Sequence, residues 1–267
     1  MYLNTWLVVG VVALGSMAAM AQAAGPADPT AQNFVAALKL VPTTIPDVPK
    51  DFALTAGQTV VAIGDSITAA GGYMRDSDVV LAREYADLKL PKIVNKGIGG
   101  QKAEDLVGRF KRDVVDLKPA VVTLSIGIND VWHRLGGPHD PAVLKAYGEN
   151  LAKMVDQAQA AGIKVILLAP TVIQEDVNAE GNKRLPMYVA AMKRVAADKK
   201  CQFVDLHAMF RAALAKKPAE VKGNWLTADG VHMSPLGDAI MAIGVLRALG
   251  VPDAKIAGEA ATSPPGK

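Results

Sequence analysis

Five short apolar runs recur along the chain between residues 59 and 205, separated by longer stretches of mixed character. Each run is four to seven residues long. Runs of this length that are rich in valine and isoleucine are typical of strands buried on both faces of a parallel sheet. The runs are 59–63, 92–95, 120–125, 163–169 and 202–205. The pattern predicts a five-stranded sheet.

The stretches between these runs predict helices. The clearest helix begins at Asp140 and Pro141, an N-cap followed by proline at the first helical position, and Gly162 ends it. Its apolar side chains recur at helical spacing and therefore share one face. They are Leu144, Tyr147, Leu151, Met154, Val155 and Ala158. Further helices are predicted over 103–115, 184–199 and 234–249.

The alternation of strands and helices predicts a single α/β domain over residues 55–253. Parallel strands are joined by right-handed crossovers, which put helices on both faces of the sheet. In an open sheet of this kind, ligands lie beyond the carboxyl ends of the strands. The residues that follow each apolar run are therefore the first candidates for function.

The N-terminus carries no charged side chain before Asp28. An apolar run over 6–14, followed by an Ala-Gln-Ala site at 21–23, predicts a signal peptide over 1–23 and export to the periplasm or beyond. A cleaved leader implies no stable membrane insertion. The alternative is a retained leader that anchors the protein facing outside, because about 20 apolar residues can span a bilayer.

The two flanking segments read as irregular structure. Residues 24–54 are rich in proline, alanine and threonine and are predicted to form a linker or lead-in. Residues 254–267 are predicted to form a flexible C-terminal tail.

Composition and charge narrow the function classes. The net charge is only +3, and no run of lysine and arginine is longer than two, which disfavours a nucleic-acid partner. The single cysteine, Cys201, excludes an intramolecular disulfide and a cysteine-built zinc site. The four histidines show no metal-ligand spacing, so we expect no metal and no cofactor. The sequence gives no indication of oligomeric state.

A serine follows the first predicted strand. Segment 64–68 reads Gly-Asp-Ser-Ile-Thr, and a serine at a strand-to-helix turn presents its hydroxyl to the ligand edge, as a nucleophile requires. Taken alone, the segment favours a simpler interpretation, in which Asp65, Ser66 or Thr68 caps the next helix.

The second and third strands run into segments that can hold an anion. Segment 95–100 reads Asn-Lys-Gly-Ile-Gly-Gly, and its glycines let the backbone turn tightly and expose an amide N–H. Segment 125–130 reads Ser-Ile-Gly-Ile-Asn-Asp, and the side-chain amide of Asn129 can donate a hydrogen bond at the same edge. Taken alone, each segment is also explained as a turn.

Asp229 and His232 precede the last predicted helix. Their spacing on a turn allows the carboxylate to hold one ring nitrogen and leave the other free, which is the arrangement of a general base. A capping Asp229 and a buried, structural His232 explain the two residues equally well.

Together, the four segments resemble the sequence blocks of the SGNH hydrolases, the family also called GDSL esterases and lipases. The blocks are Gly-Asp-Ser-Ile at 64–67, Asn-x-Gly-Ile-Gly-Gly at 95–100, Gly-Ile-Asn-Asp at 127–130 and Asp-x-x-His at 229–232. Isoleucine stands where the family name has leucine. Each block is weak by itself, but all four occur in order, and each lies after a predicted strand or before the last helix.

The resemblance implies a three-layer, flavodoxin-like α/β/α fold with strand order 2-1-3-4-5, and it implies roles. Ser66 would attack the ester, His232 would take its proton, and Asp229 would orient His232. The oxyanion would be held by the backbone N–H groups of Ser66 and Gly100 and by the Asn129 side chain, with Gly99 as the alternative to Gly100. Asp65 and Asp130 would support these loops.

The substrate is less defined than the reaction. The segment 175–186, which follows the fourth strand, is polar and is expected at the rim of the site. Polarity there favours short acyl esters, acetyl above all, on carbohydrates. The alternatives are a lysophospholipase or thioesterase with an apolar acyl groove, and a non-catalytic carbohydrate-binding or structural protein.

Overall fold

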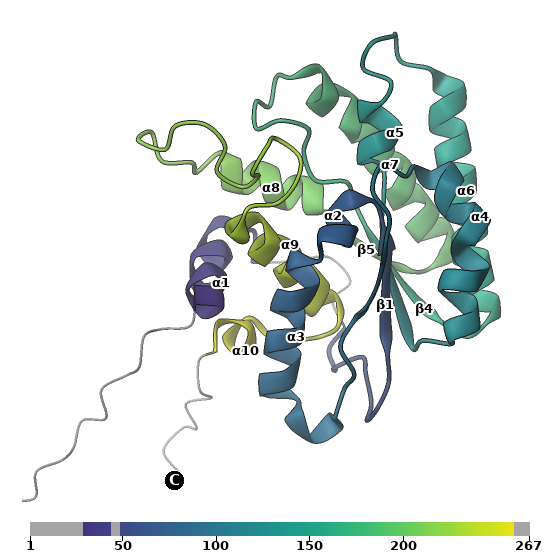
Figure 1. The fold of residues 1–267 in the computed structure, drawn as a ribbon, viewed down its shortest axis with the longest axis vertical. Helices are drawn as coiled ribbons and strands as arrows, with labels where there is room; N and C mark the ends of the chain where they lie inside the picture. The colour runs from purple at the N-terminus through teal and green to yellow at the C-terminus, as the bar shows by residue number, and fades with distance from the viewer. Residues whose placement is uncertain (1–28, 44–48, 259–267) are drawn as a thin grey trace, which may run out of the picture.

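The computed structural model describes residues 29–43 and 49–258, which form a parallel sheet between two layers of helices (Figure 1). The strand order is β2-β1-β3-β4-β5, and every neighbouring pair is parallel. The five predicted strands and the predicted order 2-1-3-4-5 are confirmed. The strands are β1 (Val60–Gly64), β2 (Val94–Gly97), β3 (Val121–Ser125), β4 (Lys164–Leu168) and β5 (Gln202–Val204).

The register of the sheet aligns the ends of its first three strands. Gly64 pairs with Gly97 of β2 on one side and with Ser125 of β3 on the other. Both β1 and β3 are buried along their whole length, in keeping with their continuous apolar sequences. The segments that follow Gly64, Gly97 and Ser125 therefore start side by side at one edge of the sheet.

Two helical layers cover the sheet. One layer contains α4 (Ala103–Asp113), α6 (Pro141–Ala160) and α7 (Glu180–Lys199), in which α6 packs against both neighbours. The other contains α3 (Gly72–Glu84), α8 (Leu206–Leu214) and α9 (Pro235–Ala248), with α9 in the middle. Helix α9 is buried along almost all of its length, because α3, α8 and the N-terminal helix α1 (Pro29–Leu40) also pack on it.

Helix α6 forms as its sequence predicts. The Asp140 carboxylate accepts a hydrogen bond from the Ala142 amide at 2.8 Å, and Pro141 occupies the first turn. Five of the six predicted face residues are buried, and Leu144 is half-buried. The helix ends at Ala160, two residues before Gly162, which adopts the left-handed conformation.

The predicted linker over 24–54 is wrong for its central part. Residues Pro29–Leu40 form helix α1, and Phe34 and Ala37 are completely buried where α1 packs on α9. Phe34, Ala37 and Val41 recur at intervals of three and four, so one face of α1 is apolar. The proline- and alanine-rich composition concealed this periodicity.

The predicted C-terminal boundary at 253 is also too early. Asp253–Ala257 form the short helix α10, in which Ile256 is completely buried. The Asp253 carboxylate accepts two hydrogen bonds from Arg247 of α9, both at 2.8 Å. The folded body therefore extends from α1 to α10.

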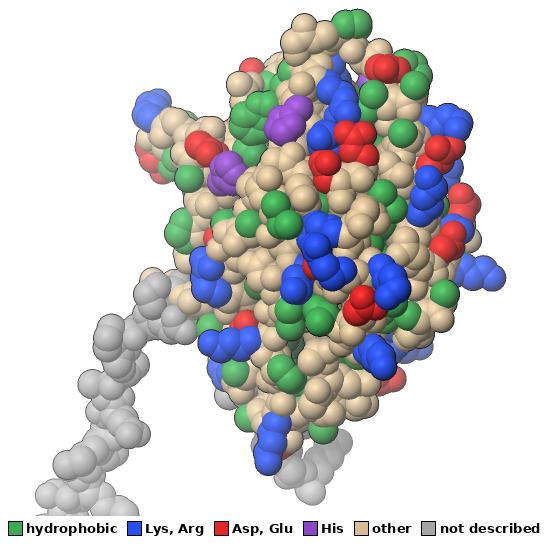
Figure 2. Space-filling model, turned by 45° about the vertical axis from the view of Figure 1, so that its right-hand side comes forward, with side chains coloured by type: hydrophobic (Ala, Val, Ile, Leu, Met, Phe, Trp, Pro, Cys, Tyr) green, Lys and Arg blue, Asp and Glu red, His purple; other side chains and the backbone are tan. Residues whose placement is uncertain are grey.

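The remaining elements are short. They are α2 (Ser66–Ala70), α5 (Ile128–Trp132) and the 3-10 turns η1 (Ala86–Leu88) and η2 (Val115–Leu117). The predicted signal peptide at 1–23 lies outside the described residues. No helix within 29–43 or 49–258 is both long and apolar enough to cross a membrane. On the face drawn in Figure 2, basic and acidic side chains lie interspersed.

Candidate active site

The structure shows which residue of segment 64–68 caps the next helix. Asp65 is the N-cap of α2, because its carboxylate accepts a hydrogen bond from the Ile67 amide at 3.0 Å. Ser66 is the first residue of that helix, and Thr68 is buried against the Tyr73 hydroxyl, 3.2 Å away. The capping role thus falls to Asp65, and the Ser66 hydroxyl remains available for another partner.

That partner is His232. Its Nε2 lies 2.9 Å from the Ser66 hydroxyl oxygen, and its Nδ1 lies 2.7 Å from a carboxylate oxygen of Asp229. A carboxylate can only accept, so Nδ1 carries the proton and the free lone pair of Nε2 faces the serine. The hydrogen bond from His232 is the main reason that the pKa of Asp229 falls to about 2, which keeps Asp229 ionised.

A small hairpin holds Asp229 and His232. Thr227 and Met233 form an antiparallel bridge, and the Ala228 amide donates to the His232 carbonyl at 2.7 Å. The second carboxylate oxygen of Asp229 accepts from the His232 amide at 2.8 Å. The relative position of carboxylate and imidazole is therefore set within a few residues of chain.

Glu175, predicted at the polar rim, is instead buried beneath this hairpin. Its side chain is only 5% exposed, and its carboxylate accepts from the amides of three successive residues and from one hydroxyl. The donors are the backbone N–H groups of Trp225, Leu226 and Thr227 and the Thr227 hydroxyl, at 2.7–2.9 Å. The preceding Gln174 amide donates to the Gly230 carbonyl at 2.7 Å. Sequence reasoning missed this support for the hairpin.

The glycine loop after β2, residues 97–100, passes beside Ser66. A Cβ built on Gly99 would lie 3.8 Å from the Ser66 Cβ, and Gly100 has a φ of +77°, a conformation that favours glycine. On the other side of the loop, a Cβ on Gly100 would lie 4.0 Å from the His133 ring. The loop thus runs between Ser66 and the end of α5.

Asn129 completes this side of the site. It lies on α5, is buried, and donates from its amide nitrogen to the Gln101 carbonyl at 3.1 Å. Gly127, which precedes α5, has a φ of +130°, and a Cβ there would come within 2.9 Å of the Tyr147 hydroxyl. The β3–α5 turn therefore requires glycine, and it directs Asn129 toward the loop that carries Gly100.

Asp65 and Asp130 are buried under the turns that follow β1 and β3, where each carboxylate accepts from a backbone amide. Both oxygens of Asp130 accept from the Ala103 amide, at 3.2 and 3.3 Å, at the start of α4. Burial raises the pKa of Asp65 to about 6 and that of Asp130 to about 7. Neither carboxyl contacts Ser66 or His232 through a hydrogen bond that the structure records.

The other three histidines lie apart from the hydrogen-bonded row formed by Ser66, His232 and Asp229. His207 is buried and its Nδ1 lies 2.6 Å from the Thr171 carbonyl, while burial lowers its pKa. His139 is half-buried and His133 is exposed next to the glycine loop. Across residues 29–43 and 49–258, no group of three or more histidine, cysteine, aspartate and glutamate side chains is arranged to hold a metal ion.

The known proteins that resemble this chain include two esterases. An acetylxylan esterase of Geobacillus stearothermophilus is 30% identical over 214 residues, which is 73% of this chain and 95% of the relative. Esterase TesA of Pseudomonas aeruginosa is 32% identical over 184 residues, 66% of this chain and 80% of that esterase.

Solved structures agree with these relatives. The crystal structure of the Geobacillus stearothermophilus acetylxylan esterase superposes with a TM-score of 0.66 at 30% identity, covering 75% of this chain and 98% of that one. An α/β-hydrolase enzyme from the metagenome of Lake Arreo, Spain, gives 0.65 at 30% identity with the same coverage. Structures also exist of catalytic mutants of the acetylxylan esterase, in which a serine, an aspartate and a histidine three positions after it are each replaced by alanine.

Residues 62–240 match the family model of the GDSL-like lipases and acylhydrolases, a span that includes all four sequence blocks. With this match over more than half of its length, the chain belongs to the GDSL-like lipase/acylhydrolase family and is an ester hydrolase.

Proposed function

We propose that this protein is a serine esterase that removes short acyl groups, acetyl above all, from carbohydrates through an acyl-enzyme on Ser66. The observation that carries the proposal is the continuous hydrogen-bonded row from Ser66 through His232 to Asp229. A serine hydroxyl is a weak nucleophile until a neighbouring base takes its proton, and this row supplies that base with the correct tautomer.

The reaction follows from the row. As the Ser66 oxygen attacks the ester carbonyl carbon, His232 Nε2 accepts the hydroxyl proton and Asp229 stabilises the imidazolium. The tetrahedral intermediate collapses when His232 returns this proton to the departing alcohol oxygen, which leaves an acyl ester on Ser66. Water then attacks that ester, and His232 accepts a proton from the water. The carboxylic acid departs as the proton returns to Ser66.

The oxyanion would be held by three N–H donors. They are the backbone amides of Ser66 and Gly100 and the side-chain amide of Asn129, which belong to three turns at one edge of the sheet. Gly99 remains the alternative to Gly100. Donors held in advance of the reaction stabilise the developing charge without reorganising, which is the largest contribution in many acyl-transfer enzymes.

The acetyl-carbohydrate substrate is supported by the relatives rather than by the rim. The acetylxylan esterase acts, as its name says, on acetylated xylan. The polar sequence of segment 175–186 gives only weak support for a carbohydrate substrate. The side chains of Glu175 and Asn182 are buried and hydrogen-bond to neighbouring loops instead of lining the rim. Asp176, Asn178 and Glu180 are the acidic and amide residues of that segment that remain exposed.

The proposal is tested by comparing wild type with Ser66→Ala on two substrate series. On p-nitrophenyl esters, we expect the acetate to be hydrolysed much faster than the decanoate, and acetylated xylo-oligosaccharides should lose acetate. A preference for the decanoate would instead favour a lysophospholipase or thioesterase. A fluorophosphonate probe should label wild type and not Ser66→Ala. Folded wild type that takes no label would favour a non-catalytic binding protein.

We also propose that the protein acts outside the cytoplasm, on the strength of the leader pattern over 1–23. One curated relative, 32% identical over 146 residues, is an uncharacterised lipoprotein of Bacillus subtilis. N-terminal sequencing of protein from isolated cell fractions tests the proposal. A mature chain that starts near residue 24 is expected outside the cytoplasm, and a full-length chain in the cytoplasmic fraction would contradict export.

A further inference from the structure

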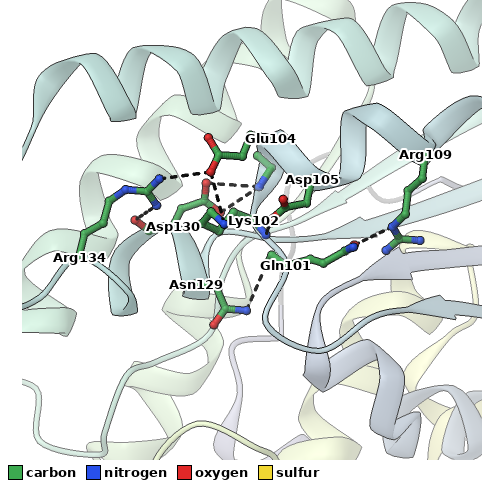
Figure 3. Close-up of polar contacts among 9 residues, drawn as sticks. Gln101, Lys102, Glu104, Asp105, Arg109, Asn129, Asp130 and Arg134 are labelled. Carbon is green, nitrogen blue, oxygen red and sulfur yellow. Dashed lines mark hydrogen bonds and ion pairs between the residues drawn. The ribbon is translucent and has the colours of Figure 1, made fainter.

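A buried arginine lies behind the candidate active site. Arg109 of α4 is 7% exposed, and its guanidinium donates four hydrogen bonds. Nε donates to the Gln101 side-chain oxygen at 2.6 Å, Nη2 to the Gly64 carbonyl at 3.1 Å, and Nη1 to the Lys96 carbonyl at 2.8 Å and to Asp113 at 2.9 Å. Figure 3 shows the guanidinium and the Gln101 side chain meeting beside the ends of the strands.

The acceptors belong to the segments that carry the proposed oxyanion donors. Gly64 is the last residue of β1, two positions before Ser66. Lys96 is the next-to-last residue of β2, and Gln101 directly follows Gly100. One planar group with donors in fixed directions thus joins both ends of the glycine loop to the end of β1.

Gln101 extends this network to Asn129, the third proposed oxyanion donor. Its side-chain oxygen is held by Arg109, and its backbone carbonyl accepts from the Asn129 side-chain amide at 3.1 Å. The dashed contacts in Figure 3 follow this path from Arg109 through Gln101 to Asn129. The carbonyl of Gln101 fixes which way the Asn129 amide points, and the Arg109 contact fixes Gln101.

Stability alone is a poor explanation for this arrangement. Burying a guanidinium is unfavourable unless it is paired and fully hydrogen-bonded, and a well-packed apolar residue is often as stable. Here Asp113, itself 9% exposed in its side chain, balances the charge, while the other three bonds are all directed at the ends of catalytic turns. The acceptors, rather than the burial, distinguish Arg109 from an ordinary structural arginine.

We propose that Arg109, acting through Gln101, is a positioning residue that aims the Asn129 side-chain amide at the oxyanion. The proposal rests on the proposed esterase function. A donor that contacts the oxyanion strengthens its bond mainly in the transition state, so misplacing it lowers kcat and leaves KM nearly unchanged. Lysine cannot replace arginine here, because one ammonium has no fork to reach the Gln101 oxygen and two carbonyls in fixed directions.

The test uses three single variants of the full chain with p-nitrophenyl acetate. Arg109→Lys keeps the charge opposite Asp113, and Gln101→Ala removes the side-chain link but keeps the backbone carbonyl. The matched control is Arg112→Gln, because Arg112 also binds Asp113, at 2.7 Å, but is 72% exposed and reaches none of the turns. Circular dichroism and thermal melting establish that each variant is folded.

We expect Arg109→Lys to lower kcat by about 10- to 100-fold and Gln101→Ala by about 10-fold, with KM within about twofold of wild type. Arg112→Gln should keep kcat within about twofold. In the Asn129→Ala background, Gln101→Ala should cost at most about threefold, because the donor that Gln101 aims is already absent.

Two results would overturn the inference. The first is a folded Arg109→Lys or Gln101→Ala whose kcat equals that of wild type. The second is a Gln101→Ala loss that is undiminished in the Asn129→Ala background, which would mean that Gln101 does not act through Asn129. If Arg109→Lys does not fold, the Gln101→Ala series decides alone. An inactive wild type would refute the esterase proposal itself, which is a different failure.

Discussion

Replacing Glu175 by glutamine is expected to destabilise the protein strongly, although the two side chains have nearly the same shape. One carboxylate oxygen of Glu175 accepts from the amides of Leu226 and Thr227 and from the Thr227 hydroxyl, at 2.7–2.8 Å. The Trp225 amide is shared between this oxygen, at 2.9 Å, and the other oxygen, at 2.8 Å. In glutamine, one of these oxygens becomes an NH₂ group, which would face the Trp225 N–H as donor against donor.

The magnitude follows from these contacts. A hydrogen bond to a charged group contributes about 1.5–3 kcal/mol and a neutral one about 0.5–1.5 kcal/mol. Turning three charge-assisted bonds into neutral ones therefore loses roughly 3 kcal/mol, and the donor-against-donor contact between the new NH₂ group and the Trp225 amide adds about 1 kcal/mol. For a domain of this size, a loss of about 3–4 kcal/mol lowers Tm by roughly 6–16 °C.

Urea unfolding followed by circular dichroism measures this loss for Glu175→Gln against wild type. The matched control is Glu180→Gln on the same segment, where the side chain is 56% exposed and pairs with Arg184 at 2.9 Å. Because the Glu180 carboxylate is exposed to solvent, its ion pair contributes at most about 1 kcal/mol. A Glu175→Gln protein within about 1 kcal/mol of wild type would refute the reasoning, because the buried carboxylate would then not hold the hairpin.

Three further predictions concern the donor, the buried acid and the first turn. Asn129→Ala should lower kcat on p-nitrophenyl acetate by about 10²–10³ with little change in KM, and unchanged kcat would exclude Asn129 from the oxyanion site. Burial raises the pKa of Asp130 from 3.8 to about 7, so between these pH values the native state binds a proton that the unfolded state has lost. The contribution of Asp130 to stability is therefore fully present below about pH 4 and is lost as pH rises through 7. The free energy of unfolding of Asp130→Asn minus that of wild type should therefore be larger at pH 8 than at pH 5. An equal difference at the two pH values would contradict the burial argument. Gly64→Ala should prevent correct folding, because the added Cβ would lie 2.5 Å from the Ser125 carbonyl oxygen. The control is Gly108→Ala on helix α4, where the added Cβ would have no atom within 4 Å. It should raise the free energy of unfolding by about 0.5–1 kcal/mol in thermal or urea melts.

The elements that the sequence predicts well are those whose pattern is local. The five strands are continuous apolar runs, and α6 carries its own cap, proline and apolar face between Asp140 and Ala160. Helix α3 escaped prediction because Arg75, Asp76 and Asp78 interrupt its apolar positions. Helix α1 escaped prediction because the proline-rich composition of the longer segment 24–54 outweighed the spacing of Phe34 and Ala37.

The candidate site divides in the same way. The four blocks identify Ser66, Gly100, Asn129, Asp229 and His232, because each follows a strand or precedes the last helix. The supporting residues are different, because they act over long stretches of chain. The Gly64 carbonyl that accepts from Arg109 is 45 residues away, and the donors to Glu175 are 50 to 52 residues away. A charged residue gives no sequence sign that it will be buried. Only the spacing of Arg109 and Asp113, four apart on one helix, hinted at a pair.

The hairpin that carries Asp229 and His232 has a consequence for the order of folding events. His232 and Asp229 are three residues apart in the sequence, whereas the hydrogen bond between His232 and Ser66 joins positions 166 apart. Contacts of long sequence separation form late, because the loop-closure entropy must be overcome first. In the proposed mechanism, activity therefore also requires the docking of the hairpin and α9 against the end of β1. During refolding, esterase activity should return after the hairpin has formed, and its rate of return reports that docking step.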